Sequence, residues 1–118
     1  MSAAMPDPQP AGDEPLFSTL LAQSPQLGDV VEDFVRILPI RMAAIENAMR
    51  SGAYDQVRAI ARDLGDRGDS CGYVALRDHS AQIEQAANDH VADALSAKLD
   101  ELRDLVTRIQ AGLQRTDE

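Results

Sequence analysis

Few residues of this chain carry side chains that commonly perform chemistry. The sequence holds two histidines, His79 and His90, and one cysteine, Cys71. Neither histidine belongs to a His-Glu-x-x-His or Glu-x-x-His pair, the spacings that hold a catalytic metal ion on one helix face. The sequence also lacks a glycine-rich phosphate loop and a nucleophile triad with the required spacing. We therefore predict that the chain is not an enzyme and that it holds no metal ion and no cofactor.

The histidines and the cysteine fit structural roles. His79 lies at the edge of the apolar face of its predicted helix, one turn from Leu76 and Ile83, so we interpret it as a partly packed histidine. His90 is expected to be an exposed residue in a first helical turn. Cys71 continues an apolar stripe and is interpreted as a small buried residue. One cysteine excludes an internal disulfide and fits a reducing compartment, so we expect a cytoplasmic protein.

Composition limits the class of partner. The 118 residues suffice for one domain, and their formal net charge of −9 disfavours nucleic acid as a ligand. Residues 1–15 have neither a basic nor an apolar segment of a signal peptide, so we expect a flexible tail and no membrane anchor. Aromatic residues make up only 3% of the chain, so the core must consist of aliphatic residues and methionine. We expect a monomer without membrane contacts.

The elements that must position these residues are predicted to be helices. Apolar residues recur with helical spacing in a short stretch over residues 16–23 and again in four longer stretches. Ser24 and Pro25 are suited to the N-cap and N1 positions of the first long helix, which would kink at Pro39 and end at Gly52.

The next two predicted helices run from Tyr54 to Cys71 and from Tyr73 to Ala87, separated by Gly72. Asn88 and Asp89 would form a turn and an N-cap before the last helix, which carries an apolar stripe from Val91 to Leu113.

Four long amphipathic helices joined by short turns predict an all-α fold, namely an antiparallel up-and-down four-helix bundle with a short N-terminal capping helix. No run of residues alternates with the period of two that a β-strand requires. The predicted domain organisation is a tail over residues 1–15, the bundle over residues 16–114, and a short C-terminal tail over residues 115–118.

The most informative stretch is A-R-D-L-G-D-R-G-D-S-C-G-Y, from Ala61 to Tyr73. With the preceding F-V-R-I-L-P-I-R-M-A-A-I and S-G-A-Y-D, it resembles the histidine-containing phosphotransfer (HPt) domain family. The motif of that family, A-H-x-L-K-G-S-A followed by Gly and an aromatic residue, lies on the second long helix of a four-helix bundle. The positions that match it are Ala61, Leu64, Gly68, Ser70, Gly72 and Tyr73. The resemblance extends over roughly residues 16–110.

The chain departs from the motif at its functional positions. Arg62 occupies the place of the phosphoacceptor histidine, Gly65 that of the following lysine, and Asp66 that of a glycine that permits close approach. Phosphotransfer in the family requires a neutral imidazole nitrogen that attacks a phosphoaspartate. Arginine stays protonated and has no free lone pair. The resemblance therefore implies a domain that no longer relays phosphate and instead docks a response-regulator receiver domain or a histidine kinase.

Helical geometry provides a docking surface for that role. When the apolar stripe of this helix faces inward, steps of 100° per residue point Arg62 and three carboxylates to solvent, with Arg58 near the edge. The resemblance implies a receiver pocket that is acidic and binds a divalent cation, and an arginine can hold carboxylate or phosphate there in a bidentate manner. The neighbouring carboxylates oppose this role. The predicted docking residues are Arg58, Arg62, Gly65, Asp66 and Asp69, and Asp55 shares their face.

Three other interpretations stay open. Arg62 can be an ordinary surface arginine held by Asp66 one turn away. The chain can be an active phosphotransfer protein that uses His79 or His90. It can also be a structural module that self-associates through its weakly apolar fourth helix, in which case the family likeness reflects only shared architecture.

Overall fold

Helices joined by short turns make up most of the described part of the chain, and a short non-helical segment precedes them. The computed structural model describes residues 14–117, so most of the predicted tail over residues 1–15 lies outside the described residues. Within the described range there is no β-strand, and the all-helical fold class predicted from the sequence is confirmed.

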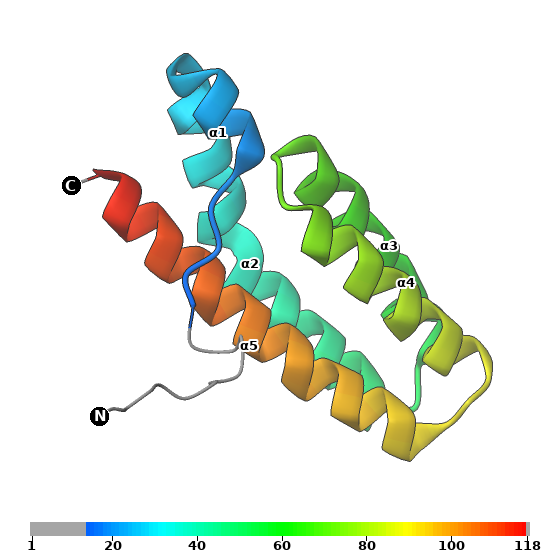
Figure 1. Cartoon of the computed structure of the whole chain (residues 1–118). Helices are drawn as coiled ribbons and strands as arrows, with labels where there is room; N and C mark the ends of the chain where they lie inside the picture. The colour runs from blue at the N-terminus through cyan, green and yellow to red at the C-terminus, as the bar shows by residue number, and fades with distance from the viewer. Residues whose placement is uncertain (1–13, 118) are drawn as a thin grey trace, which may run out of the picture.

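Residues 14–117 contain one short α-helix, one 3-10 turn and four long helices. They are α1 (Thr19–Gln23), η2 (Pro25–Leu27), α2 (Gly28–Arg50), α3 (Tyr54–Ser70), α4 (Val74–Asn88) and α5 (Ala92–Asp117). Successive long helices run in opposite directions, and α3 and α4 form a tight hairpin (Figure 1). Helix α2 packs against α3 and α5, and α4 packs against the same two helices. Each long helix therefore has two long neighbours.

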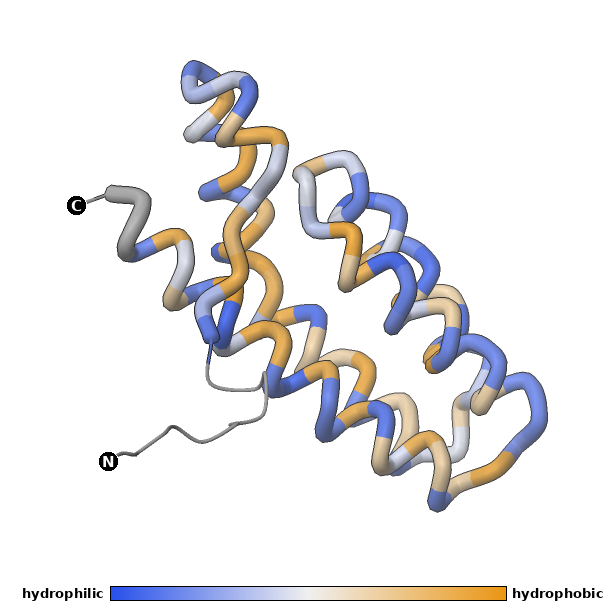
Figure 2. The backbone as a smooth tube through the Cα atoms, in the orientation of Figure 1, coloured by the Kyte–Doolittle hydropathy of each residue, from blue (hydrophilic) through white to orange (hydrophobic). Residues whose placement is uncertain are grey.

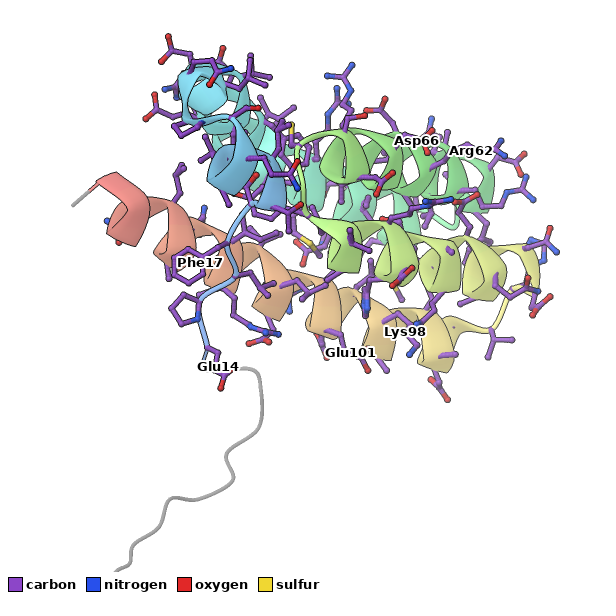
Figure 3. All side chains as sticks on the ribbon, turned by 45° about the horizontal axis from the view of Figure 1, so that its top comes forward. Glu14, Phe17, Arg62, Asp66, Lys98 and Glu101 are labelled. Atoms are coloured by element: carbon purple, nitrogen blue, oxygen red, sulfur yellow. The ribbon has the colours of Figure 1, made fainter. Side chains whose placement is uncertain are left out.

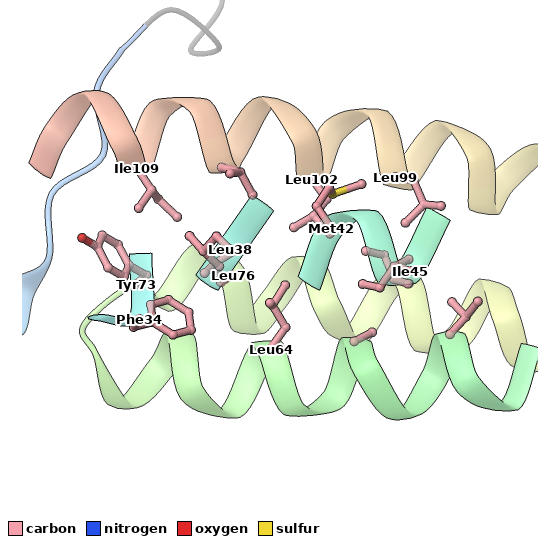
Figure 4. Close-up of a cluster of buried hydrophobic side chains, with 14 of the residues drawn as sticks. Phe34, Leu38, Met42, Ile45, Leu64, Tyr73, Leu76, Leu99, Leu102 and Ile109 are labelled. Atoms are coloured by element: carbon pink, nitrogen blue, oxygen red, sulfur yellow. The ribbon is translucent and has the colours of Figure 1, made fainter. Parts of the chain in front are cut away.

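The apolar stripes of the four long helices meet in one core (Figure 4). Along each helix apolar residues alternate with polar ones, and the outer edge of the α3–α4 hairpin is largely polar (Figure 2). Each large aliphatic side chain that is fully buried contributes about 1.5–3 kcal/mol to stability. The fully buried large side chains are Val31, Leu38, Ile45, Val57, Leu64, Leu76, Ile83, Leu95, Leu102 and Ile109.

Two features of the helices follow the predictions. Pro39 lies inside α2, which continues past it as a single helix. Gly52 and Gly72 have φ angles of 72° and 89°, and each follows the C-cap residue of its helix, α2 or α3. These left-handed conformations suit glycine, because a Cβ atom would strain the backbone there.

Two helix starts differ from the predictions. Ser24 and Pro25 open the 3-10 turn η2 instead of α2, and the Ser24 side chain makes no capping hydrogen bond. Helix α4 extends to Asn88, Asp89 follows as its C-cap, and His90 adopts a φ of 55°. Asp89 is therefore not the N-cap of α5. Periodicity located both helices, but it does not determine which polar residue beside a helix acts as its cap.

Residues 14–18 form an N-terminal strap that crosses α5 before the chain enters α1. The Leu16 amide donates a hydrogen bond to the Arg108 carbonyl at 2.9 Å, and Arg108 Nε donates to the Glu14 carbonyl at 2.7 Å. Leu16 therefore does not belong to the short helix predicted over residues 16–23, which starts only at Thr19. The end of the predicted tail is held on α5.

The predicted C-terminal tail over residues 115–118 also needs correction. Helix α5 continues to Asp117, so the backbone of this segment is helical as far as it is described. No proline or glycine follows Leu113 to end the helix, and the apolar stripe alone marks only where a helix is buried, not where it ends.

Candidate functional site

The outer face of α3 carries most of the residues singled out from the sequence. Asp55, Arg62, Asp66 and Asp69 are exposed, and Arg58 is half-buried. The Arg62 side chain is 75% exposed and lies in the middle of the helix, with Asp66 next to it on the outer side of α3 (Figure 3). The face predicted from helical periodicity is therefore the solvent-facing one.

Arg62 has a different partner from the one expected. Its Nε lies 4.0 Å from Glu84 Oε1 on α4, and no ion pair joins it to Asp66 within residues 14–117. The interpretation of Arg62 as an arginine held by Asp66 is thus wrong in its partner. A long ion pair at an exposed position contributes at most about 1 kcal/mol, so the guanidinium is only weakly held.

Polar pairs connect the outer faces of α3 and α4. Arg58 Nη1 donates to Asn88 Oδ1 at 2.9 Å, Arg62 lies near Glu84, and Asp69 Oδ2 lies 3.6 Å from Arg77 Nη1. In each pair the two residues lie symmetrically about Tyr73 in the sequence, as the register of an antiparallel hairpin requires. Sequence reasoning missed the α4 members of these pairs, although the short turn after α3 was a usable signal for them.

The groove between α3 and α4 has balanced charges. It encloses about 570 Å³ and is lined by Asp55, Arg58, Arg62 and Glu84, together with small and amide side chains. Arg58 also hydrogen-bonds to Asp55. Because two carboxylates face two guanidinium groups, the groove has no net positive charge that would attract a phosphate group.

Asp66 lies on the other side of the outer face, toward α2. It is exposed and has no cationic partner within the described residues. It borders a second groove, between α2 and α3, with a volume of about 430 Å³. That groove is lined by Val30, Asp33, Phe34, Ile37, Asp66, Arg67, Ser70 and Cys71.

Gly65 requires a correction to its predicted role in docking. The residue is buried, and a Cβ atom placed on it would lie 2.8 Å from Ser80 Cβ on α4. Gly68 is placed similarly, at 2.8 Å from Leu76 Cβ, so both glycines set the close spacing of α3 and α4. A buried residue offers no surface to a partner, and Gly65 therefore contributes to the site only by holding the two helices together.

The two histidines lie in different surroundings. His79 is 8% exposed, and its Nε2 lies 2.9 Å from the Lys98 carbonyl oxygen and 3.6 Å from Glu101 Oε1. A carbonyl only accepts hydrogen bonds, so Nε2 carries a proton and has no lone pair for nucleophilic attack. His90 is exposed in the turn before α5, where its ring makes an edge contact with Tyr54 at a centroid distance of 4.7 Å.

Cys71 is buried at the base of the α2–α3 groove, as expected for a residue of the apolar stripe. Burial raises the pKa of its thiol, and the nearby Arg67 opposes this only in part. The thiolate is therefore scarce near neutral pH.

Among residues 14–117 no group of three or more His, Cys, Asp or Glu side chains is arranged to hold a metal ion. Nor does any helix in that range have the length and apolar character needed to span a membrane. In comparisons with known proteins, no protein-family model, curated protein or solved structure matches this chain. The α3 face and the sequence motif on it are therefore the features that bear on function.

Proposed function

We propose that this chain is an HPt-like domain of bacterial two-component phosphorelay signalling that has lost its phosphoacceptor. It acts by docking a receiver domain or a histidine kinase. The proposal includes the architecture, an antiparallel up-and-down four-helix bundle capped by α1. The alternating directions of α2, α3, α4 and α5 and the two long neighbours of each support that architecture.

The observation that carries the proposal is the position of Arg62. Its side chain is 75% exposed in the middle of α3, within the stretch that resembles the HPt motif and at the place of the family's histidine. Relay chemistry needs a nitrogen with a free lone pair on this face. A guanidinium has none at physiological pH, so this face is suited to binding and not to accepting phosphate.

Docking would use the guanidinium as a charged, planar donor. Glu84 holds it at 4.0 Å, a distance at which a carboxylate or phosphoryl group of a partner can compete. Of the two neighbouring carboxylates that oppose an acidic partner, Asp69 is offset by Arg77 at 3.6 Å. Of these two carboxylates, only Asp66 has no cationic partner within residues 14–117, and it still opposes an acidic pocket. Arg62 is 75% exposed and is available to attract such a pocket.

The first experiment tests phosphotransfer. The receiver domains encoded in the same genome are labelled with radioactive acetyl phosphate and mixed with the wild-type chain. We expect no label on this protein. Label on the wild type would refute the loss of relay chemistry, and its disappearance in a His79→Gln, His90→Gln double variant would establish the alternative of an active phosphotransfer protein.

A second experiment tests docking. Each receiver domain, with Mg²⁺, and the cytoplasmic part of each histidine kinase from that genome are titrated against the wild type, Arg62→Ala and Arg36→Ala. Arg36 is a control of similar exposure, because its side chain is 66% exposed on α2, where it pairs with Glu32 and Asp33. We expect Arg62→Ala to weaken binding about tenfold, roughly 1.4 kcal/mol, and Arg36→Ala to leave it unchanged. No binding by any member of the panel would overturn the proposal.

A further inference from the structure

The groove between α2 and α3 has an apolar floor that residues 14–117 leave open. Phe34 and Cys71 are buried at its base, while Ile37 is half-buried and Val30 is 54% exposed. Ile40, 68% exposed, lies one turn beyond Ile37 on α2. Apolar side chains that share one open face in this way are typical of a binding surface.

The unpaired charge on the rim of this groove is negative. Asp33 and Asp66 lie on it, and the one cation, Arg67, is held by Asp63 at 3.1 Å. Asp33 pairs with Arg36 at 3.1 Å, whereas Asp66 has no cationic partner within residues 14–117. Asp66 is thus a carboxylate with an unused capacity to pair with a cation, directly beside an apolar surface.

The shape of the groove favours a polypeptide over a small ligand. From Val30 to Ile37 it follows α2 for two turns, a length of about 10 Å. Its volume of about 430 Å³ is adequate for a few large side chains. Small-molecule sites enclose most of their ligand, whereas more than half of the Val30 side chain faces solvent. An open groove of this length is suited to the apolar face of a helix.

Two occupants from this chain itself are disfavoured by charge. Residues 1–13 contain no Lys or Arg that could pair with Asp66. A second copy of the chain would bring the same acidic rim and a net charge of −9 to the contact. The remaining occupant is a partner protein with cationic side chains.

We propose that the α2–α3 groove docks an amphipathic helical segment of a partner protein, whose apolar residues cover Val30 and Ile37 and whose Lys or Arg pairs with Asp66. This groove is separate from the Arg62–Glu84 contact. Docking there does not require that the partner is a receiver domain.

The experiment uses two fluorescent synthetic peptides, each a helix-forming chain of about 15 residues. Both carry leucines at positions i, i+3 and i+7, and they differ only in having arginine or glutamate beside the leucines. The full chain is titrated into each peptide, and amide chemical shifts of the ¹⁵N-labelled chain locate the contact. We expect the arginine peptide to bind at least about tenfold more tightly than the glutamate peptide, and to shift residues of α2 and α3 around the groove.

Three variants make the result specific. Ile37→Asp should abolish binding, and Asp66→Lys, at an exposed position, should weaken the arginine peptide about tenfold without affecting the fold. Val74→Asp is the matched control, because Val74 is a 52% exposed residue on α4 outside the groove. The Val74→Asp variant should bind the arginine peptide as tightly as the wild type does. The proposal is overturned if the arginine peptide does not bind, if it binds no better than the glutamate peptide, or if Asp66→Lys changes nothing.

Discussion

Arg62 and Asp66 lie one turn apart on α3, yet they belong to different surfaces. Four residues advance a helix by slightly more than one turn, so the two side chains diverge from the centre of the outer face. Arg62 leans toward Glu84 of α4, and Asp66 borders the groove shared with α2. Substitutions at these two positions therefore report on two separate contacts, although they are neighbours on one helix.

Titration of the buried Tyr73 side chain should make the stability of the protein depend on pH. Burial raises its pKa to about 12, and a Cys71 thiolate adds to the shift. A tyrosine in the unfolded chain titrates near pH 10. Between about pH 10 and 12 the folded state keeps a proton that the unfolded state has lost, so stability falls as the pH rises, by roughly 2–3 kcal/mol in total. Below pH 10 this residue makes stability neither rise nor fall with pH.

Tyr73→Phe removes that dependence and keeps the ring, which stacks on Phe34 at a centroid distance of 6.2 Å. We expect urea unfolding measured in steps from about pH 9 to pH 11 to show a shallower loss of stability in the variant than in the wild type. Some loss of stability with rising pH should remain in the variant, because the pKa of Cys71 is also raised. Equal slopes in the two proteins would contradict a buried, late-titrating Tyr73.

Among the secondary-structure elements, glycines determine how closely neighbouring segments of the chain pack. The α3–α4 hairpin closes tightly because Gly65 and Gly68 leave room for α4. The N-terminal strap crosses α5 directly above Gly112, where a Cβ atom would overlap the Leu16 carbonyl oxygen. Backbone atoms cannot move aside as the end of a flexible side chain can, so the strap and a side chain at position 112 exclude each other.

Gly112→Ala should therefore lower stability by about 1–3 kcal/mol, measured by thermal unfolding. The Leu16 amide, which donates to the Arg108 carbonyl, should also exchange its hydrogen faster. Gly28→Ala is the matched control, because its new methyl group would meet only Leu21 Cδ2, at 3.9 Å. Alanine favours a helix over glycine, so this variant should be as stable as the wild type or more so. The same loss in both variants would rule out a steric conflict with the strap.

For the whole molecule, charge dominates how copies of the chain meet. The chain has twenty acidic residues and eleven basic ones. Such a net charge keeps molecules apart in solution. The large apolar side chains that are exposed in the described range lie on α2, on α4, in the strap and in the turn before α5. They are Phe17, Val30, Ile40, Val74 and Val91.

We therefore expect light scattering to give the mass of a monomer at both low and high salt, even in concentrated solution. A dimer that persists at high dilution would support the alternative of a self-association module. Val74→Asp would then be informative, because it places a charge at the start of α4, the helix assigned to self-association from the sequence.

Sequence alone determined the helical class, the order of the long helices and the outer face of α3. Periodic burial is a local property: the spacing of Val57, Ala61 and Leu64 already requires one face to be inside, whatever covers it. That Arg62 points outward follows from the same spacing. The left-handed turn residues Gly52 and Gly72 were also predictable, because few other residues adopt that conformation.

Tertiary structure decided which residues are partners. Glu84, not Asp66, lies next to Arg62, Gly65 is buried against Ser80, and Leu16 belongs to a strap instead of a helix. Each of these facts depends on the distance and register between two segments, and a helix repeat carries no information about its neighbour. The groove beside Asp66 is of the same kind, because it forms where α2 and α3 pack together and no other element of the described range lines it.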